Sequence, residues 1–167
     1  MIVKNGGICF CKTLVSSNSS IPADTLKDIN GTMYASSISK GDLNLYKANQ
    51  NDNQIGIKMR FGVGTTAPTA EDYCLAERTV SGTDINTLLM CTNASVGYST
   101  HGAVIYTFSF QNSSAAPITV KELCLECTPS GSGGAKFMVA RALIQPRTIA
   151  SGEIVTFSYT INPCGGA

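Results

Sequence analysis

Charged side chains are scarce in this chain. They make up 14% of its 167 residues, against about 25% in a typical soluble domain. The net charge is +1, so there is no basic field to attract nucleic acid or a membrane surface. A surface with so little net charge associates readily. The sequence therefore predicts self-association, with neither nucleic acid nor membrane as a partner.

Tryptophan is absent, aromatic residues make up 7% of the chain, and His101 is the single histidine. Sugar sites on β-sheets usually use exposed aromatic rings, and most rings here fall in expected strand cores. A Cys–His or Ser–His catalytic pair would have to use His101, which no nucleophile-elbow motif accompanies. We therefore expect no catalytic residue and no cofactor.

Long apolar runs are also absent, and none approaches the roughly 18 residues of a membrane span. The start, MIVKNGGICFCKTLVSS, begins like a signal peptide, but Asn5, Gly6, Gly7 and Lys12 interrupt its apolar stretch. We expect no secretion signal in this segment.

Seven cysteines cannot all pair within one chain. Most lie in apolar, strand-like runs, which predicts buried free thiols in a reducing cytoplasm. Cys9, Cys11, Cys124 and Cys127 together supply enough thiolates for a zinc site. However, Cys124 and Cys127 are three residues apart in an expected strand, so they point to opposite faces. This disfavours a shared zinc ion.

Alternation of apolar and polar residues is the dominant pattern, and it predicts β-strands. It is clearest at residues 103–112 and 153–161. Further strands are expected at residues 118–127, 136–144, 55–63 and 74–80. Turn signals separate the later strands, at residues 111–117, 128–134 and 150–152. This spacing predicts an all-β fold: an antiparallel β-sandwich or a jelly-roll-like barrel.

The sequence divides near residue 54. Residues 55–167 carry the strand pattern and form the expected sandwich domain. Residues 1–54 are polar, rich in turn residues and only weakly periodic. Two interpretations stay open for them: an N-terminal arm that orders against a partner or another copy, or peripheral strands and loops of the same sandwich.

A Gly- and Thr-rich segment, GVGTTAPTAEDYCL, occupies residues 62–75. It lacks the lysine of a Walker loop, and the third glycine and long helix of a dinucleotide fingerprint. We interpret it as a rigid crossing between strands or a contact surface in an oligomer, with a short helix expected over residues 69–73. Replacing Asp72 with alanine or Pro68 with glycine is expected to weaken folding or assembly. The candidate structural and assembly residues are Thr65, Thr66, Pro68, Asp72 and Tyr73.

Three charged residues, Glu77, Glu122 and Arg141, stand among apolar residues of expected strands. A charge in such a position is costly unless it is paired. A Glu122–Arg141 bridge between adjacent strands is the first interpretation, and an ion pair across a subunit interface is the second. Glu122 and Arg141 complete the set of candidate structural and assembly residues.

Two blocks of the chain, covering roughly residues 55–161, resemble a pattern of tailed-bacteriophage virion proteins. RFGVGTTAPTAEDYCLAERTV, at residues 60–80, is similar to their strand and VGxGTTxPTxxDYxL-like loop. YTFSFQNSSAAPITVKELCL and FMVARALIQPRTIASGEIVTFSYTI are similar to their C-terminal pattern, with its ITVKEIGL-like and LLAR-like segments. Cys124 stands where that pattern has glycine, and Gly62-Val63-Gly64 is a variant of its VGxG. Residues 1–54 are unmatched.

The resemblance implies a non-enzymatic virion component made in the cytoplasm of a bacterial host. Head-fibre, capsid-decoration, neck and tail accessory proteins are all of this kind. The implied partners are further copies of the chain, in a trimer by analogy, and the major capsid, neck or tail proteins. A tail or receptor- or carbohydrate-binding accessory module is the alternative.

Overall fold

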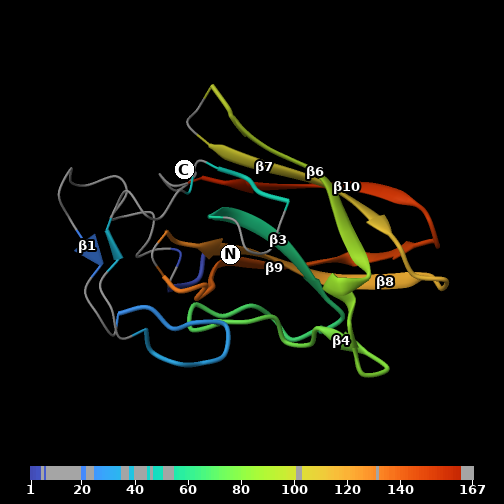
Figure 1. Cartoon of the computed structure of the whole chain (residues 1–167), viewed down its shortest axis with the longest axis horizontal. Helices are drawn as coiled ribbons and strands as arrows, with labels where there is room; N and C mark the ends of the chain where they lie inside the picture. Colours follow the sequence, from blue (N-terminus) through green and yellow to red (C-terminus); the bar gives the residue numbers. More distant parts are fainter. Residues whose placement is uncertain are drawn as a thin grey trace.

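Two antiparallel three-stranded sheets pack face to face as a β-sandwich (Figure 1). The computed structural model describes residues 1–4, 6, 20–21, 25–34, 38–39, 45, 47–50, 55–100, 103–130 and 132–162. The elements are β1 (Ser20–Ile21), β2 (Ile38–Ser39), β3 (Gly56–Gly62), β4 (Thr79–Val80), β5 (Thr83–Asp84), a 3-10 turn η1 (Ile85–Thr87), β6 (Leu89–Tyr98), β7 (Val104–Asn112), β8 (Ile118–Thr128), β9 (Phe137–Ile149) and β10 (Ile154–Ile161). The expected all-β, antiparallel sandwich is confirmed.

The upper sheet in Figure 1 has the strand order β10-β7-β6. The alternation at residues 103–112 places Tyr106, Phe108 and Phe110 on the inner face of β7, where they are buried. β10 lies antiparallel to β7 and directs Val155 and Phe157 to the same side. The predicted turn at residues 150–152 separates β9 from β10, and Gly152 has a φ of 75° there.

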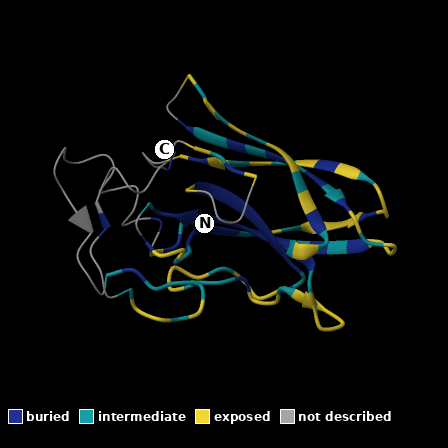
Figure 2. Cartoon of the chain, in the orientation of Figure 1, coloured by how far each residue is buried: buried dark blue, intermediate teal, exposed yellow. Residues whose placement is uncertain are grey.

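The lower sheet has the order β3-β8-β9 and faces the first across the core. Ile57, Met59 and Phe61 of β3 point inward, as the alternation predicts. The ring of Phe61 lies 4.7 Å from that of Phe110 and 4.9 Å from that of Phe157, which joins the two sheets. Figure 2 shows the buried residues concentrated in β3, β8 and the first half of β9.

Segments from the first 54 residues lie along both outer edges of the lower sheet. Ile2 forms an antiparallel bridge to Ala140 on β9, and Ala48 forms a parallel bridge to Ile57 on β3. Leu26 is buried in the main core together with Ile38 and Leu45. The described part of this segment therefore packs on the sandwich at several separate points.

Two expectations about local structure need correction, and one strand was not predicted. Residues 74–80 form no long strand, because only Thr79 and Val80 pair, in the short hairpin β4–β5. Residues 69–73 form a turn instead of a helix. The unpredicted strand is β6, which pairs antiparallel with β7 along its whole length. Within the described part of the chain, no helix has the length and apolar character of a membrane span.

Candidate functional site

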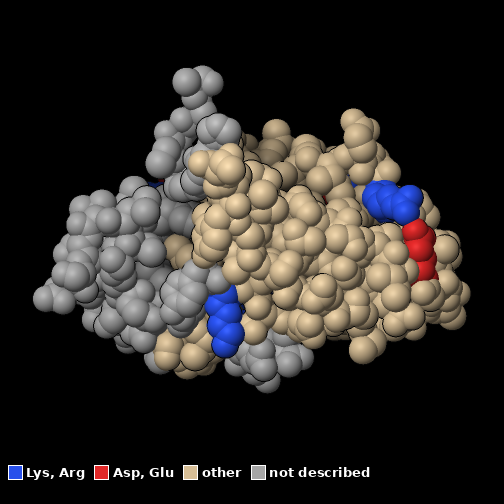
Figure 3. Space-filling view, turned by 90° about the horizontal axis from the view of Figure 1, so that it is seen from above, with Lys and Arg blue, Asp and Glu red and all other residues tan. Residues whose placement is uncertain are grey.

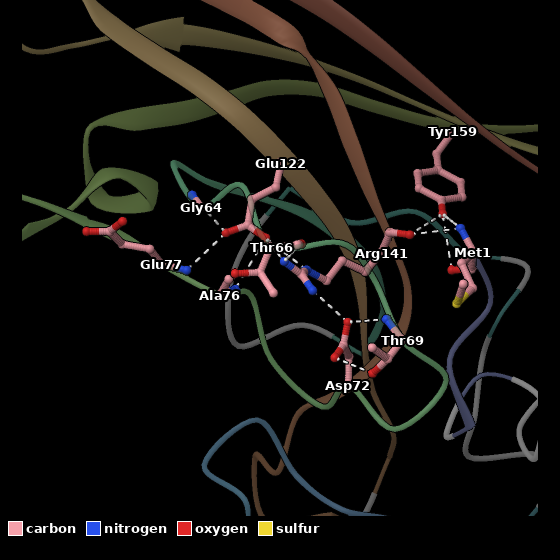
Figure 4. Close-up of polar contacts among 10 residues, drawn as sticks. All are labelled: Met1, Gly64, Thr66, Thr69, Asp72, Ala76, Glu77, Glu122, Arg141 and Tyr159. Carbon is pink, nitrogen blue, oxygen red and sulfur yellow. Dashed lines mark hydrogen bonds and ion pairs between the residues drawn. The ribbon is translucent and has the colours of Figure 1, made fainter.

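Five charged residues are buried on the outward side of the lower sheet. The Gly- and Thr-rich loop contacts two of them, Glu122 and Arg141 (Figure 4). A charge in such a place is tolerated only when partners compensate for the lost water. The five residues are Lys58, Arg60, Glu122, Glu126 and Arg141. Lys58 and Arg60 point away from the core, as the alternation predicts, yet both are buried.

The Glu122 carboxylate is the centre of this region, and the segment around it is shown in Figure 4. Its Oε1 accepts hydrogen bonds from the backbone N–H groups of Gly64, at 3.2 Å, and Glu77, at 3.0 Å. Its Oε2 accepts one from the N–H of Ala76, at 3.2 Å. Three amides from the two ends of the loop therefore converge on one carboxylate, in the manner of a backbone anion site.

Two glycines make this convergence possible. A Cβ on Gly62 would stand 2.3 Å from Glu122 Oε1, and one on Gly64 would stand 2.5 Å from the same atom. Any side chain at either position would therefore push the carboxylate away from the loop. The Gly-rich loop does bind an anion with its backbone, and that anion is the protein's own carboxylate.

Arg141 holds the middle of the loop, and the predicted Glu122–Arg141 bridge is confirmed as a contact within the chain. Its Nη2 and Nε lie 2.7 and 2.8 Å from Glu122 Oε2. Its Nη1 lies 2.6 Å from Asp72 Oδ2. Nη2 also donates to the carbonyl oxygen of Thr66, at 2.8 Å. We call Glu122, Arg141, Asp72 and the loop amides bound to them the carboxylate clamp.

Asp72 closes the tip of the loop. It accepts hydrogen bonds from the Thr69 N–H at 2.9 Å and the Thr69 hydroxyl at 2.8 Å. Burial opposes ionisation of Asp72, but these bonds and the Arg141 guanidinium outweigh it and hold its pKa below the usual value. The bond from the Thr69 N–H to the Asp72 carboxylate is one of the two reciprocal bonds of a capping box, although the chain makes a turn where a helix was expected.

The clamp suits holding a loop better than moving a proton. Glu122 already receives five donors, which uses all the lone-pair directions of a carboxylate. A general base works best with a pKa near the operating pH, and the pKa of Asp72 is shifted in the opposite direction.

A groove of about 320 Å³ lies over the clamp, lined in part by Asp72, Tyr73 and Arg141.

Acidification is expected to destabilise the protein through Asp72. The folded-state pKa lies below the unfolded value of about 3.9, so the contribution of Asp72 is fully present above that pH and is lost as the pH falls through the folded pKa. Melting temperatures of the wild type and Asp72→Asn should differ most near neutral pH and converge at lower pH. A difference that stays constant from pH 7 to pH 3 would contradict this account. Glu71→Gln, in the same loop but exposed, is the control.

The other predicted loop residues lie outside the clamp. Thr65 is exposed and Pro68 is half-buried. Tyr73 packs on the segment at residues 25–34: the ammonium of Lys27 lies 4.3 Å from its ring centroid, and a Cβ on Gly31 would meet the ring at 3.2 Å. Glu77 contributes only its backbone, because its side chain is exposed. The structure thus brings together Thr66, Asp72, Glu122 and Arg141.

Sequence reasoning missed a second ionic group on the same face, centred on the buried Glu126. Its Oε2 lies 3.5 Å from Arg60 Nε, and its Oε1 lies 3.8 Å from Arg78 Nη1. The spacing of Glu122, Cys124 and Glu126 by two residues places all three on one strand face. This two-residue spacing was the signal in the sequence that could have grouped these residues, but it does not show that a loop covers the face.

Cys124 and Cys127 lie on opposite faces of β8, as predicted. Cys124 packs with Val3, Leu75 and Met138, whereas Cys127 belongs to the core between the sheets. Burial raises the pKa of Cys74, Cys91 and Cys124, which keeps these thiols protonated. Among the described residues no cluster of three His, Cys, Asp or Glu side chains could hold a metal ion. Cys9, Cys11 and His101 lie outside the described residues.

Comparison with protein-family models, curated proteins and solved structures found no match to this chain.

Proposed function

We propose that this chain is a non-enzymatic structural protein of a tailed-bacteriophage virion that self-associates and attaches to the capsid or neck. It would act as a head-decoration or head-fibre component, assembled in the cytoplasm of the bacterial host. Further copies of the chain and the major capsid, neck or tail proteins would be its partners.

One observation carries the proposal: the blocks that resemble virion proteins coincide with the residues that build the clamp. The first block supplies Gly62, Gly64 and Asp72, and the second supplies Glu122 and Arg141. The shared pattern therefore has a physical use in this chain, as the fastening of one loop to one sheet. A loop held in one conformation presents the same contact surface in every copy of the chain. Repeated copies on a symmetric particle then make even weak contacts effective through avidity.

Immunogold electron microscopy of the phage that encodes this chain tests the proposal. We expect label on intact particles, spread over the head for a decoration or fibre protein, or at one point for a neck or tail component. Particles from a phage with the gene deleted are the control. Intact particles that carry no label, and from which mass spectrometry also recovers no copy of the chain, would overturn the proposal.

A further inference from the structure

The outward side of the upper sheet carries no charged residue. Its positions form rows across β6, β7 and β10, given by the strand register. The rows are Met90, Gln111 and Ile154; Asn93, Ser109 and Thr156; Ser95, Thr107 and Ser158; and Gly97, Ile105 and Thr160. We call these positions the uncharged face. In Figure 3, which looks onto this side of the molecule, Lys, Arg, Asp and Glu lie only at the margin of the described surface.

The uncharged face is open to solvent in the isolated chain. All its positions on the two flanking strands are exposed, and those on β7 are half-buried. Its hydroxyl groups pair across strands: Thr107 with Ser158 at 3.0 Å, and Ser109 with Thr156 at 2.8 Å. The face is therefore an array of hydroxyl and amide groups with apolar residues at its ends.

The distribution of charge over the two sheets is the reverse of that expected for an isolated chain in water. Five charged residues are buried on the outward side of the lower sheet, while β6, β7 and β10 contain none. Proteins commonly place charges on exposed strands, because these oppose strand-to-strand association. Within the described residues, β6 also ends its sheet with no further strand beside it. A face of this kind is expected to be covered in the functional state.

We infer that the uncharged face is the surface through which copies of this chain associate. Residues near a symmetry axis meet their own copies. A carboxylate only accepts hydrogen bonds and an ammonium or guanidinium only donates, so neither can pair with itself. Hydroxyl and amide groups both donate and accept, and they can pair with identical groups. The composition of the face therefore favours a second copy over a partner of opposite charge.

The apolar ends of the face supply the energetic anchors for such a contact. Met90 and Ile154 flank Gln111 in one row and are 58% and 59% exposed. Three strands spaced by about 4.8 Å, and about 30 Å long, give a face of roughly 400 Å², about half of the 800 Å² that each partner buries in a standard interface.

The inference rests on the self-association that is part of the proposed function, but it does not depend on the chain being a virion component. Two matched lysine substitutions test it. Thr156 lies on the uncharged face, and Thr148 lies on the lower sheet. Each is exposed, and its hydroxyl lies 2.8 Å from the hydroxyl of a residue on a neighbouring strand. We expect sedimentation velocity to show that Thr156→Lys raises the dissociation constant of the oligomer at least about 100-fold. Thr148→Lys should leave it unchanged. A wild type that stays monomeric, or a Thr156→Lys variant that associates like the wild type, would overturn the inference.

Hydroxyl-radical footprinting of the unmodified protein keeps the test decisive if Thr156→Lys fails to fold. Met90 lies on the uncharged face, whereas Met33, 44% exposed, lies in the segment at residues 25–34 and serves as an internal control. Raising the protein concentration should protect Met90 from oxidation and leave Met33 unchanged. Equal oxidation of Met90 at all concentrations would refute the inference. Unlabelled phage particles would refute the virion function alone, so the two failures are distinguishable.

Discussion

Replacing Glu122 with glutamine is expected to lower the free energy of unfolding by about 3–5 kcal/mol, the range for breaking a buried ion pair from one side. Glutamine keeps the size of the side chain but presents an NH₂ group to donors that need an acceptor. The guanidinium of Arg141, buried with Glu122, would lose a full negative charge from its surroundings. Urea-induced unfolding followed by circular dichroism measures the loss, and the melting temperature should fall by roughly 6–20 °C.

An exposed ion pair in the same region provides the control. Lys4 and Glu71 lie 3.5 Å apart, with side chains that are 63% and 76% exposed. Glu71→Gln is therefore expected to change stability by less than about 0.5 kcal/mol. If Glu122→Gln proved as mild as Glu71→Gln, the carboxylate clamp would have no structural role. If Glu122→Gln is costly, as expected, a double-mutant cycle with Arg141→Met separates the ion pair from the contribution of the loop amides.

The strands with regular alternation were predictable, because their pattern and their pairing agree. β7 and β10 have aromatic and β-branched residues at every second position, and these fill the core. β6 was missed because its sequence, LMCTNASVGY, mixes small, polar and apolar residues with little periodicity. Its strand conformation comes from pairing with β7, which is tertiary information.

Residues 74–80 show the opposite error, a strand pattern with no strand. The N–H groups of Ala76 and Glu77 bond to Glu122, so they are not available to a neighbouring strand. The candidate pair Glu122–Arg141 was predictable, because both are charges in apolar strands. The roles of Gly62 and Gly64 were not predictable, since they depend on the position of a carboxylate about 60 residues away along the chain.

Deleting residues 1–54 is expected to abolish cooperative folding of the remaining chain. Val3, Leu26, Ile38 and Leu45 are buried against the sandwich. Burying four such side chains contributes roughly 6–12 kcal/mol, comparable with the whole stability of a typical domain, about 5–15 kcal/mol. The deletion would also uncover the edge of β3 that residues 47–49 occupy, through the bonds from Ile57 N to Lys47 O and from Asn49 N to Ile57 O. Circular dichroism melting and solubility of the 55–167 fragment measure the effect.

A single substitution in the full chain measures how much one buried side chain of residues 1–54 contributes to stability, without removing the whole segment. Leu26 is 1% exposed, so Leu26→Ala is expected to cost about 2–5 kcal/mol of unfolding free energy, the usual range for a buried leucine. Met33→Ala, on the exposed side of the same segment, should cost far less. A 55–167 fragment that melts cooperatively at the temperature of the full chain would instead make residues 1–54 a dispensable arm. Because the described part of these residues lies along both edges of the lower sheet, we expect the fragment to behave as an incomplete sandwich.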